Sequence, residues 1–257
     1  MAFSGDFYIR RDSWLHRLDP RVKLVLTAAL AAIALRINTL FPALAMLGGI
    51  HLLLISARIP RAKFLWVWTL LLPVTIMILI FWPLFNREGR VLFSFGILRI
   101  TLEALMEGAA MSLRICIMGF ACFVLLFSTD QAKIVRALVK LGIPYRIGLM
   151  LAIALRYLPT FFGIITMVTE AQKSRGLDLD RGPLIKKLKA YMPILAAVLI
   201  SGIKTSDNLS KALETRAFSA PARKRTCYSD IAMRPGDFVF LGITLAATVF
   251  LLVFFHK

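Results

Sequence analysis

The chain has 257 residues, 59% of them hydrophobic, and its 32 Lys and Arg against 14 Asp and Glu give a formal net charge of +18. With a mean hydropathy of +0.76 the chain is too apolar for an ordinary soluble domain, which indicates a polytopic membrane protein. Its basic residues punctuate apolar runs and never gather into a polar domain, which argues against a nucleic-acid partner. Such a cation excess is expected where cytoplasmic loops meet anionic lipid.

Several apolar stretches are long enough to cross a membrane, which takes about 20 residues in a helix. The first twenty residues contain no apolar core followed by a cleavage site, so no removable signal peptide is expected. We predict five transmembrane helices, over residues 22–37, 38–57, 64–86, 102–129 and 238–255.

The distribution of Lys and Arg predicts the orientation of these helices, because cations concentrate on cytoplasmic connections. Basic groups precede the first span, separate the second from the third and follow the fourth. The connection 86–99 is also basic and fits less well. The N-terminus is therefore expected in the cytoplasm and, by parity, the C-terminus outside the cell.

Two later apolar stretches are predicted not to cross. Residues 147–169 are interrupted by Arg156 and Pro159, and residues 190–203 are only 14 long, around Pro193. If both crossed, the basic segment between them would lie outside, against the rule that places positive loops inside. We expect long amphipathic helices that lie along the cytoplasmic face.

The predicted fold is therefore an all-α polytopic membrane protein with about five transmembrane helices and long amphipathic cytoplasmic coupling helices. We divide the chain into a cytoplasmic N-terminal segment, a four-helix transmembrane part, a cytoplasmic or interfacial coupling domain and a C-terminal transmembrane helix, over residues 1–21, 22–129, 130–234 and 235–257.

A short motif occurs twice in the predicted coupling domain. Residues 171–177 and 212–218 share an alanine, a small hydroxyl residue, an arginine, a small residue and an apolar residue, and Arg175 and Arg216 are 41 positions apart. A doubled motif predicts a doubled partner. The residues concerned are Ser174, Arg175, Gly176, Thr215, Arg216 and Ala217.

Charged residues inside predicted membrane helices could carry chemistry or structure. Glu103, Glu107 and Arg114 share one face of the fourth span, where they could form an ion pathway or a buried ion pair that orients packing. Arg156 leaves the same choice open, and we favour the structural role for both.

The chain shows no motif of a catalytic site. It has no Walker loop, no Gly-x-Ser-x-Gly elbow and no His-Glu-x-x-His, and its histidines and cysteines have no metal-ligand spacing. We expect no catalytic residue, no metal site and no cofactor bound by this chain, so any ATP hydrolysis must occur elsewhere.

The start of the first span is also well marked. Asp19 is expected to cap the helix and Pro20 to occupy its first turn, while Arg21 and Lys23 are expected to anchor it at the cytosolic headgroups.

Residues 12–23 resemble the start of the transmembrane T component of energy-coupling factor (ECF) importers of vitamins and metal ions. The two arginine triplets resemble that family's paired Ala-Arg-Gly-type signatures, and the resemblance covers about residues 12–255. Thr215 and Ala217 stand where the family's signature usually has alanine and glycine. The second motif is therefore expected to bind its partner more weakly than the first.

The resemblance implies that Arg175 and Arg216 each dock into one of two ABC-type ATPases, which bind the ATP and Mg²⁺, and that a separate membrane subunit, the S component, binds the substrate. The apolar face of the second coupling helix is expected to support that subunit through Leu184, Leu188, Tyr191 and Leu195. The nature of the cargo, and whether this T component serves one S component or several, do not follow from the sequence.

Two other classes of protein remain as alternatives. A self-sufficient secondary carrier would need a site at the membrane midplane, for which Glu107 and Arg114 are the candidates. An integral membrane enzyme would need a nucleophile or a metal cluster, and the sequence offers neither.

Overall fold

The computed structural model describes Ile9 and residues 13–86, 91–95, 98–177, 183–218 and 233–254. The elements in chain order are α1 (Trp14–Arg17), α2 (Pro20–Arg36), α3 (Leu40–Ser56), α4 (Arg61–Phe85), β1 (Val91–Phe95), β2 (Leu98–Thr101), α5 (Leu102–Ser128), α6 (Gln131–Lys140), α7 (Tyr145–Ser174), α8 (Leu184–Thr215) and α9 (Pro235–Phe254). The fold is all-α, as predicted, except for one antiparallel β1–β2 hairpin in the basic connection before α5.

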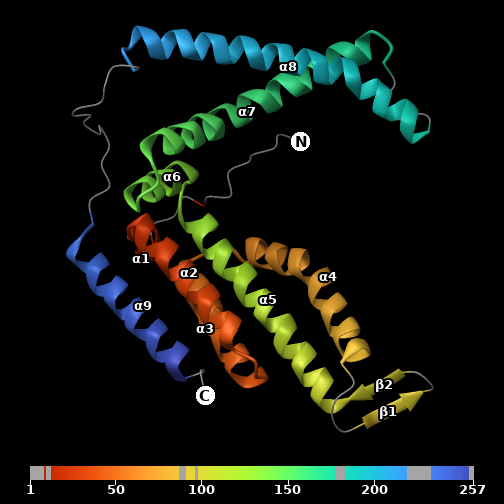
Figure 1. The fold of residues 1–257 in the computed structure, drawn as a ribbon, viewed down its shortest axis with the longest axis vertical. Helices are drawn as coiled ribbons and strands as arrows, with labels where there is room; N and C mark the ends of the chain where they lie inside the picture. Colours follow the sequence, from red (N-terminus) through yellow and green to blue (C-terminus); the bar gives the residue numbers. More distant parts are fainter. Residues whose placement is uncertain are drawn as a thin grey trace. The chain divides into compact units, whose positions relative to one another are not determined.

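The elements form two compact units (Figure 1). The bundle unit consists of α1 to α6, the hairpin and α9, and the second unit, the α7–α8 unit, contains the two longest helices. The sequence-based division grouped α6 with the coupling helices. In the structure α6 packs against α2 in the bundle unit instead.

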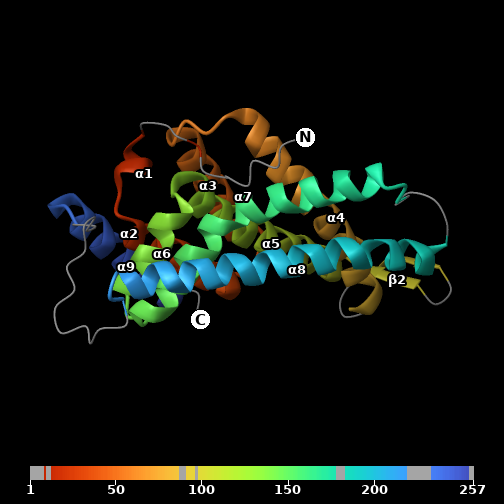
Figure 2. The same cartoon turned by 90° about the horizontal axis from the view of Figure 1, so that it is seen from above.

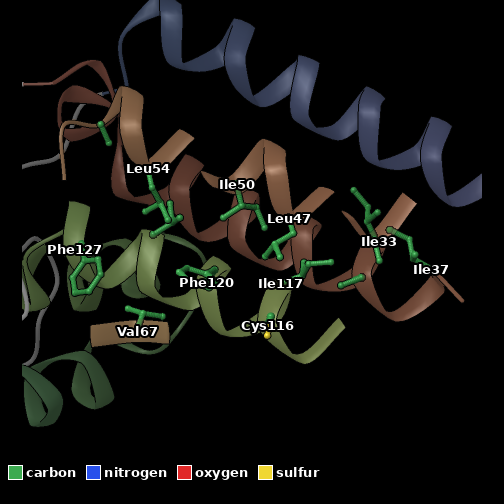
Figure 3. Close-up of a cluster of buried hydrophobic side chains, with 14 of the residues drawn as sticks. Ile33, Ile37, Leu47, Ile50, Leu54, Val67, Cys116, Ile117, Phe120 and Phe127 are labelled. Atoms are coloured by element: carbon green, nitrogen blue, oxygen red, sulfur yellow. The ribbon is translucent and has the colours of Figure 1, made fainter. Parts of the chain in front are cut away.

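The core of the bundle unit lies between α2, α3 and α5, to which α1 adds Leu15 and α4 adds Val67 (Figure 3). Residues three or four apart along each helix point inward, as helical periodicity requires. The labelled members are Ile33, Ile37, Leu47, Ile50, Leu54, Val67, Cys116, Ile117, Phe120 and Phe127, each at most 7% exposed. Most other apolar side chains of α4 face outward, as expected for a helix that lies against lipid or another membrane protein.

Small residues of α5 allow α4 to approach closely. The Ser112 hydroxyl lies 3.3 Å from the Thr75 carbonyl oxygen, and the Thr75 hydroxyl lies 3.2 Å from the Cys116 sulfur. A Cβ atom added at Gly108 would lie only 3.2 Å from Cβ of Trp82. A row of small residues at about one-turn spacing is a frequent way of packing helices within membranes.

Gly108 provides a test of this close packing. Gly108→Val should lower the thermal unfolding midpoint of the detergent-solubilised protein, because overpacking costs about 1–3 kcal/mol and the Trp82 Cβ atom cannot rotate away. Gly48→Val on α3 is the matched control, since nothing lies within 4 Å of a Cβ at that position. Equal unfolding midpoints for the two variants would contradict the packing described.

The N-terminus of α2 has the predicted cap. The Asp19 carboxylate accepts a hydrogen bond from the Arg21 amide at 2.8 Å, and Pro20 is the first helical residue. Lys23, however, does not reach out to the headgroups as expected. Its side chain is 2% exposed, and Nζ donates a hydrogen bond to the Ser128 carbonyl oxygen at 2.9 Å, at the C-terminal end of α5.

The beginning of α9 completes a buried polar cluster around Lys23. Asp237 is 5% exposed and accepts hydrogen bonds from the backbone amides of Asp19 and Arg234, at 3.3 and 2.8 Å. The carboxylates of Asp19 and Asp237 each attract the Lys23 ammonium, whereas burial and the ammonium of Lys133 oppose its charge more strongly. Acids at the N-terminal ends of α2 and α9 and a lysine at the C-terminal end of α5 also suit the helix dipoles. The cluster therefore ties α9 to the bundle.

Five of the described helices are long and apolar enough to cross a membrane, namely α4, α5, α7, α8 and α9. This number matches the prediction, but the set differs. Helices α2 and α3 have 17 residues each and fall short of this length criterion, whereas α7 and α8 meet it because they continue as helices through Pro159 and Pro193. The criterion concerns length and composition only, so the position of α7 and α8 along the membrane surface stays a prediction.

Candidate docking site on α7 and α8

Helices α7 and α8 are antiparallel neighbours (Figures 1 and 2). One of their contacts is that of the Phe161 ring with Gly202, where the ring lies 3.4 Å from the position that a Cβ would occupy. Because the helices are antiparallel, the two arginine motifs, each at a C-terminal end, lie toward opposite ends of the α7–α8 unit. The α7–α8 unit thus carries one arginine motif at each of its two ends.

The first arginine motif is the C-terminal cap of α7. Arg175 is the cap residue, and Gly176 follows in the left-handed conformation with φ of +87°. The Gly176 amide donates to the Lys173 carbonyl and the Leu177 amide to the Gln172 carbonyl, each at 3.0 Å. This hydrogen-bond pair defines a Schellman motif, which reverses the chain and satisfies the last carbonyls of the helix.

The second arginine motif repeats this geometry at the end of α8. Arg216 is the cap residue, the Ala217 amide donates to the Glu214 carbonyl at 2.9 Å, and the Phe218 amide donates to the Leu213 carbonyl at 3.0 Å. Ala217 takes the left-handed position with φ of +54°. A side chain makes this conformation unfavourable by roughly 1–2 kcal/mol. The sequence repeat is therefore a repeat of one helix-ending structure, strained in its second copy.

The arginine side chains of both motifs lie at the surface of the α7–α8 unit. Arg175 and Arg216 are exposed, and neither guanidinium has a polar partner among the residues that the structure describes. The preceding hydroxyls bond back to their own helices, Ser174 to the Glu170 carbonyl and Thr215 to the Ala212 carbonyl, at 3.0 and 3.1 Å. Among the described residues each motif thus presents one unpaired guanidinium, with five donors, at a helix end closed by hydrogen bonds.

The strain at Ala217 gives a direct prediction. Ala217→Gly should stabilise the end of α8 by about 1 kcal/mol, because glycine adopts a positive φ without steric cost. Gly176→Ala should destabilise the end of α7 by a similar amount. Amide hydrogen exchange at residues 176–177 and 217–218 measures both effects. If Ala217→Gly left exchange at its own motif unchanged, the strain would be absent.

The charged residues of the fourth predicted span have separate partners. Glu107 accepts a hydrogen bond from the Asn86 side chain at 2.5 Å, whereas Arg114 donates to the Ile37 carbonyl and to Asn38 Oδ1 at 2.7 and 2.6 Å. Within the described part of the chain Glu107 and Arg114 form no ion pair with each other, so that expectation was wrong. Both still have structural roles, since Glu107 joins α5 to the end of α4 and Arg114 caps the C-terminal end of α2.

Arg156 differs from these two residues. It is exposed on α7 and has no polar partner within the described ranges, so the structural ion pair expected for it is not formed. An unpaired arginine in the middle of a helix is costly in a bilayer.

The apolar residues predicted to meet a substrate-binding subunit are exposed on α8. Leu188, Tyr191 and Leu195 are 72%, 52% and 54% exposed. Leu184 is the first residue of α8, and its side chain lies outside the described part. Their spacing of three and four residues places the three described side chains on one side of the helix.

Sequence reasoning missed two features of this region. It did not identify the aromatic contact between Tyr145 at the start of α7 and Phe218 after the second motif, where the ring centroids are 6.4 Å apart. It also did not identify the small residue after each arginine as the left-handed residue of a helix end. The glycine at position 176, directly after a helix, was the available signal.

The five long apolar helices place the chain in the class of multi-pass membrane proteins. The profile of the cobalt transport protein family CbiQ matches residues 11–228. The energy-coupling factor transporter transmembrane protein EcfT of Listeria innocua is 32% identical over 224 residues, which cover 82% of this chain and 83% of the relative. The EcfT proteins of Lacticaseibacillus paracasei and Streptococcus thermophilus are each 31% identical over 259 residues, covering 96% and 97% of both chains, respectively.

The chain therefore belongs to the CbiQ and EcfT family of transmembrane components of energy-coupling factor transporters.

Proposed function

We propose that this protein transmits ATP-driven motion of two ABC-type ATPase subunits to a separate substrate-binding membrane subunit, for the uptake of a vitamin or a metal ion. ATP and Mg²⁺ would be bound by the ATPases, and this chain would supply no catalytic residue. The carrying observation is the pair of equivalent helix ends, each with an exposed arginine that has no polar partner among the described residues. Two equivalent arginine motifs on one chain suit two similar partner subunits.

The chemistry of the Arg175 and Arg216 side chains suits binding in a groove of a partner protein. A guanidinium forms charge-assisted, often bidentate hydrogen bonds with carboxylates or carbonyls. The residue after each arginine turns the backbone away from the helix axis, so the arginine stands at the tip of the helix. Motion of an ATPase would therefore act along a helix of about 45 Å, at 1.5 Å per residue.

We further propose that α7 and α8 lie on the cytoplasmic side, together with the N-terminus, and that α8 meets the substrate-binding subunit. Arg156, exposed and unpaired in the part of the chain that the structure describes, supports a position outside the hydrocarbon. The apolar residues Leu188, Tyr191 and Leu195 would give a contact without directional bonds, which can slide and release.

Purification of the tagged protein from its native membrane tests the proposal. Two nucleotide-binding subunits and one substrate-binding membrane subunit should co-purify with it, and substrate uptake in proteoliposomes should require all of them together with ATP. Uptake by this chain alone would instead support a secondary carrier. The separate hydrogen-bond partners of Glu107 and Arg114 do not favour that alternative.

A further inference from the structure

The two arginine motifs differ in what holds them in place. The first ends in Gly176, which adopts its positive φ freely, whereas the second ends in Ala217, which does not. With equal hydrogen bonds in both motifs, the end of α8 should open more readily than the end of α7 unless another contact supports it.

Such a contact exists for the second motif. The Phe218 ring stacks on the Tyr145 ring, with centroids 6.4 Å apart and planes inclined by 28°. Tyr145 is the first residue of α7, directly after its cap residue Pro144. The stack therefore joins the C-terminal end of α8 to the N-terminal end of the neighbouring helix. The corresponding residue of the first motif is the aliphatic Leu177.

The position of Phe218 makes this contact effective. The Phe218 amide donates the hydrogen bond to the Leu213 carbonyl that closes the Schellman motif, so a ring held in place also holds that amide. Residues at this position of a Schellman motif commonly make an apolar contact with their own helix. Here the described ring contact crosses to another helix.

We propose that Tyr145 is a positioning residue for Arg216. By clasping Phe218, it keeps the strained second motif closed and so fixes the direction in which Arg216 leaves the helix. Tyr145 is half exposed, so its ring contributes to the clasp more than to a core. This inference rests on the proposed function only for the role of Arg216 in docking, since the clasp itself is a property of this chain.

The clasp is tested first by amide hydrogen exchange in the full-length protein. Tyr145→Ala should speed exchange at Ala217 and Phe218 about two- to tenfold, the range set by aromatic pair energies. Exchange at Gly176 and Leu177 should not change and is the internal control. Tyr145→Phe keeps the ring that stacks on Phe218 and should therefore retain most of the protection at Ala217 and Phe218. Phe218→Leu, which copies the first motif, should repeat the Tyr145→Ala result.

The positioning role is tested by ATPase binding in two backgrounds. With Arg175→Ala, only the second motif remains, and adding Tyr145→Ala should weaken binding of the ATPase subunits further. With Arg216→Ala, adding Tyr145→Ala should change nothing. Equal weakening in both backgrounds, or unchanged exchange at Ala217 and Phe218, would overturn the proposal. If neither arginine variant affected binding, the docking function would fail, while the exchange data would still decide whether the clasp exists.

Discussion

Replacing Arg175 and Arg216 together with alanine should abolish co-purification of the ATPase subunits and all ATP-dependent uptake, while the protein stays folded in the membrane. Each guanidinium is exposed and unpartnered among the described residues, so its removal disturbs no polar contact within that part of the chain. A charge-assisted hydrogen bond contributes about 1.5–3 kcal/mol. The two motifs are far apart and should act additively, which amounts to a loss of affinity of roughly 10²- to 10⁴-fold.

A matched control separates docking from bulk charge. Lys173→Ala with Lys211→Ala removes the same two positive charges from exposed positions near the same helix ends. Binding of the ATPases to this control should remain near the parent level, because a lysine on the side of the helix does not stand at its tip. Wild-type binding by the double arginine variant, or an equal loss in the lysine control, would refute specific docking.

Lys23→Met should be the most damaging single substitution in the bundle unit. It removes the ammonium that offsets the buried carboxylates of Asp19 and Asp237 and that donates to the Ser128 carbonyl. Asp19 Oδ2 already has no hydrogen-bond partner in the described structure, so the remaining charge would be poorly compensated. Leaving a buried hydrogen-bonding group without its partner costs about 1–3 kcal/mol, and more for a charged group, which thermal unfolding in detergent would detect.

Two further variants show whether charge compensation is the cause. Arg36→Met, at the exposed end of the same helix, should leave the unfolding midpoint nearly unchanged. Adding Asp237→Asn to Lys23→Met should recover part of the lost stability, because one uncompensated carboxylate is removed with its partner. If the double variant were less stable than Lys23→Met by the full cost of Asp237→Asn alone, the two residues would be energetically independent.

The sequence predicted those features that depend on local pattern. Helices α2, α3, α4, α5 and α9 lie within a few residues of the predicted spans, since apolar runs and their flanking charges mark them, and Asp19 forms the predicted cap. The burial of Lys23 could not be predicted, because Ser128 and Asp237 reach it only after folding. For the same reason Glu107 and Arg114, neighbours on one helix face, could not be assigned to separate partners on other elements.

The candidate site shows the same division. The arginine repeat is visible in the sequence, and the glycine at position 176 indicates a helix end. A residue such as alanine rarely adopts a positive φ, so the second copy of the cap at Ala217 is visible only by analogy with the first. The contact between Tyr145 and Phe218 joins the N-terminal end of α7 to the C-terminal end of α8. These residues are far apart in the sequence, so no local pattern predicts the contact.

The helix ends also show which backbone position an arginine must occupy to form the same motif on another helix. Helix α3 ends in the same hydrogen-bond pattern, with the Arg58 amide bonded to the Ile55 carbonyl and the Ile59 amide to the Leu54 carbonyl. There the arginine itself takes the left-handed position, with φ of +55°, one place later than in α7 and α8. Its side chain therefore departs on the other side of the reversal. An arginine introduced at the end of another helix would reproduce the arginine motif only if it stood directly before the left-handed residue, as Arg175 does.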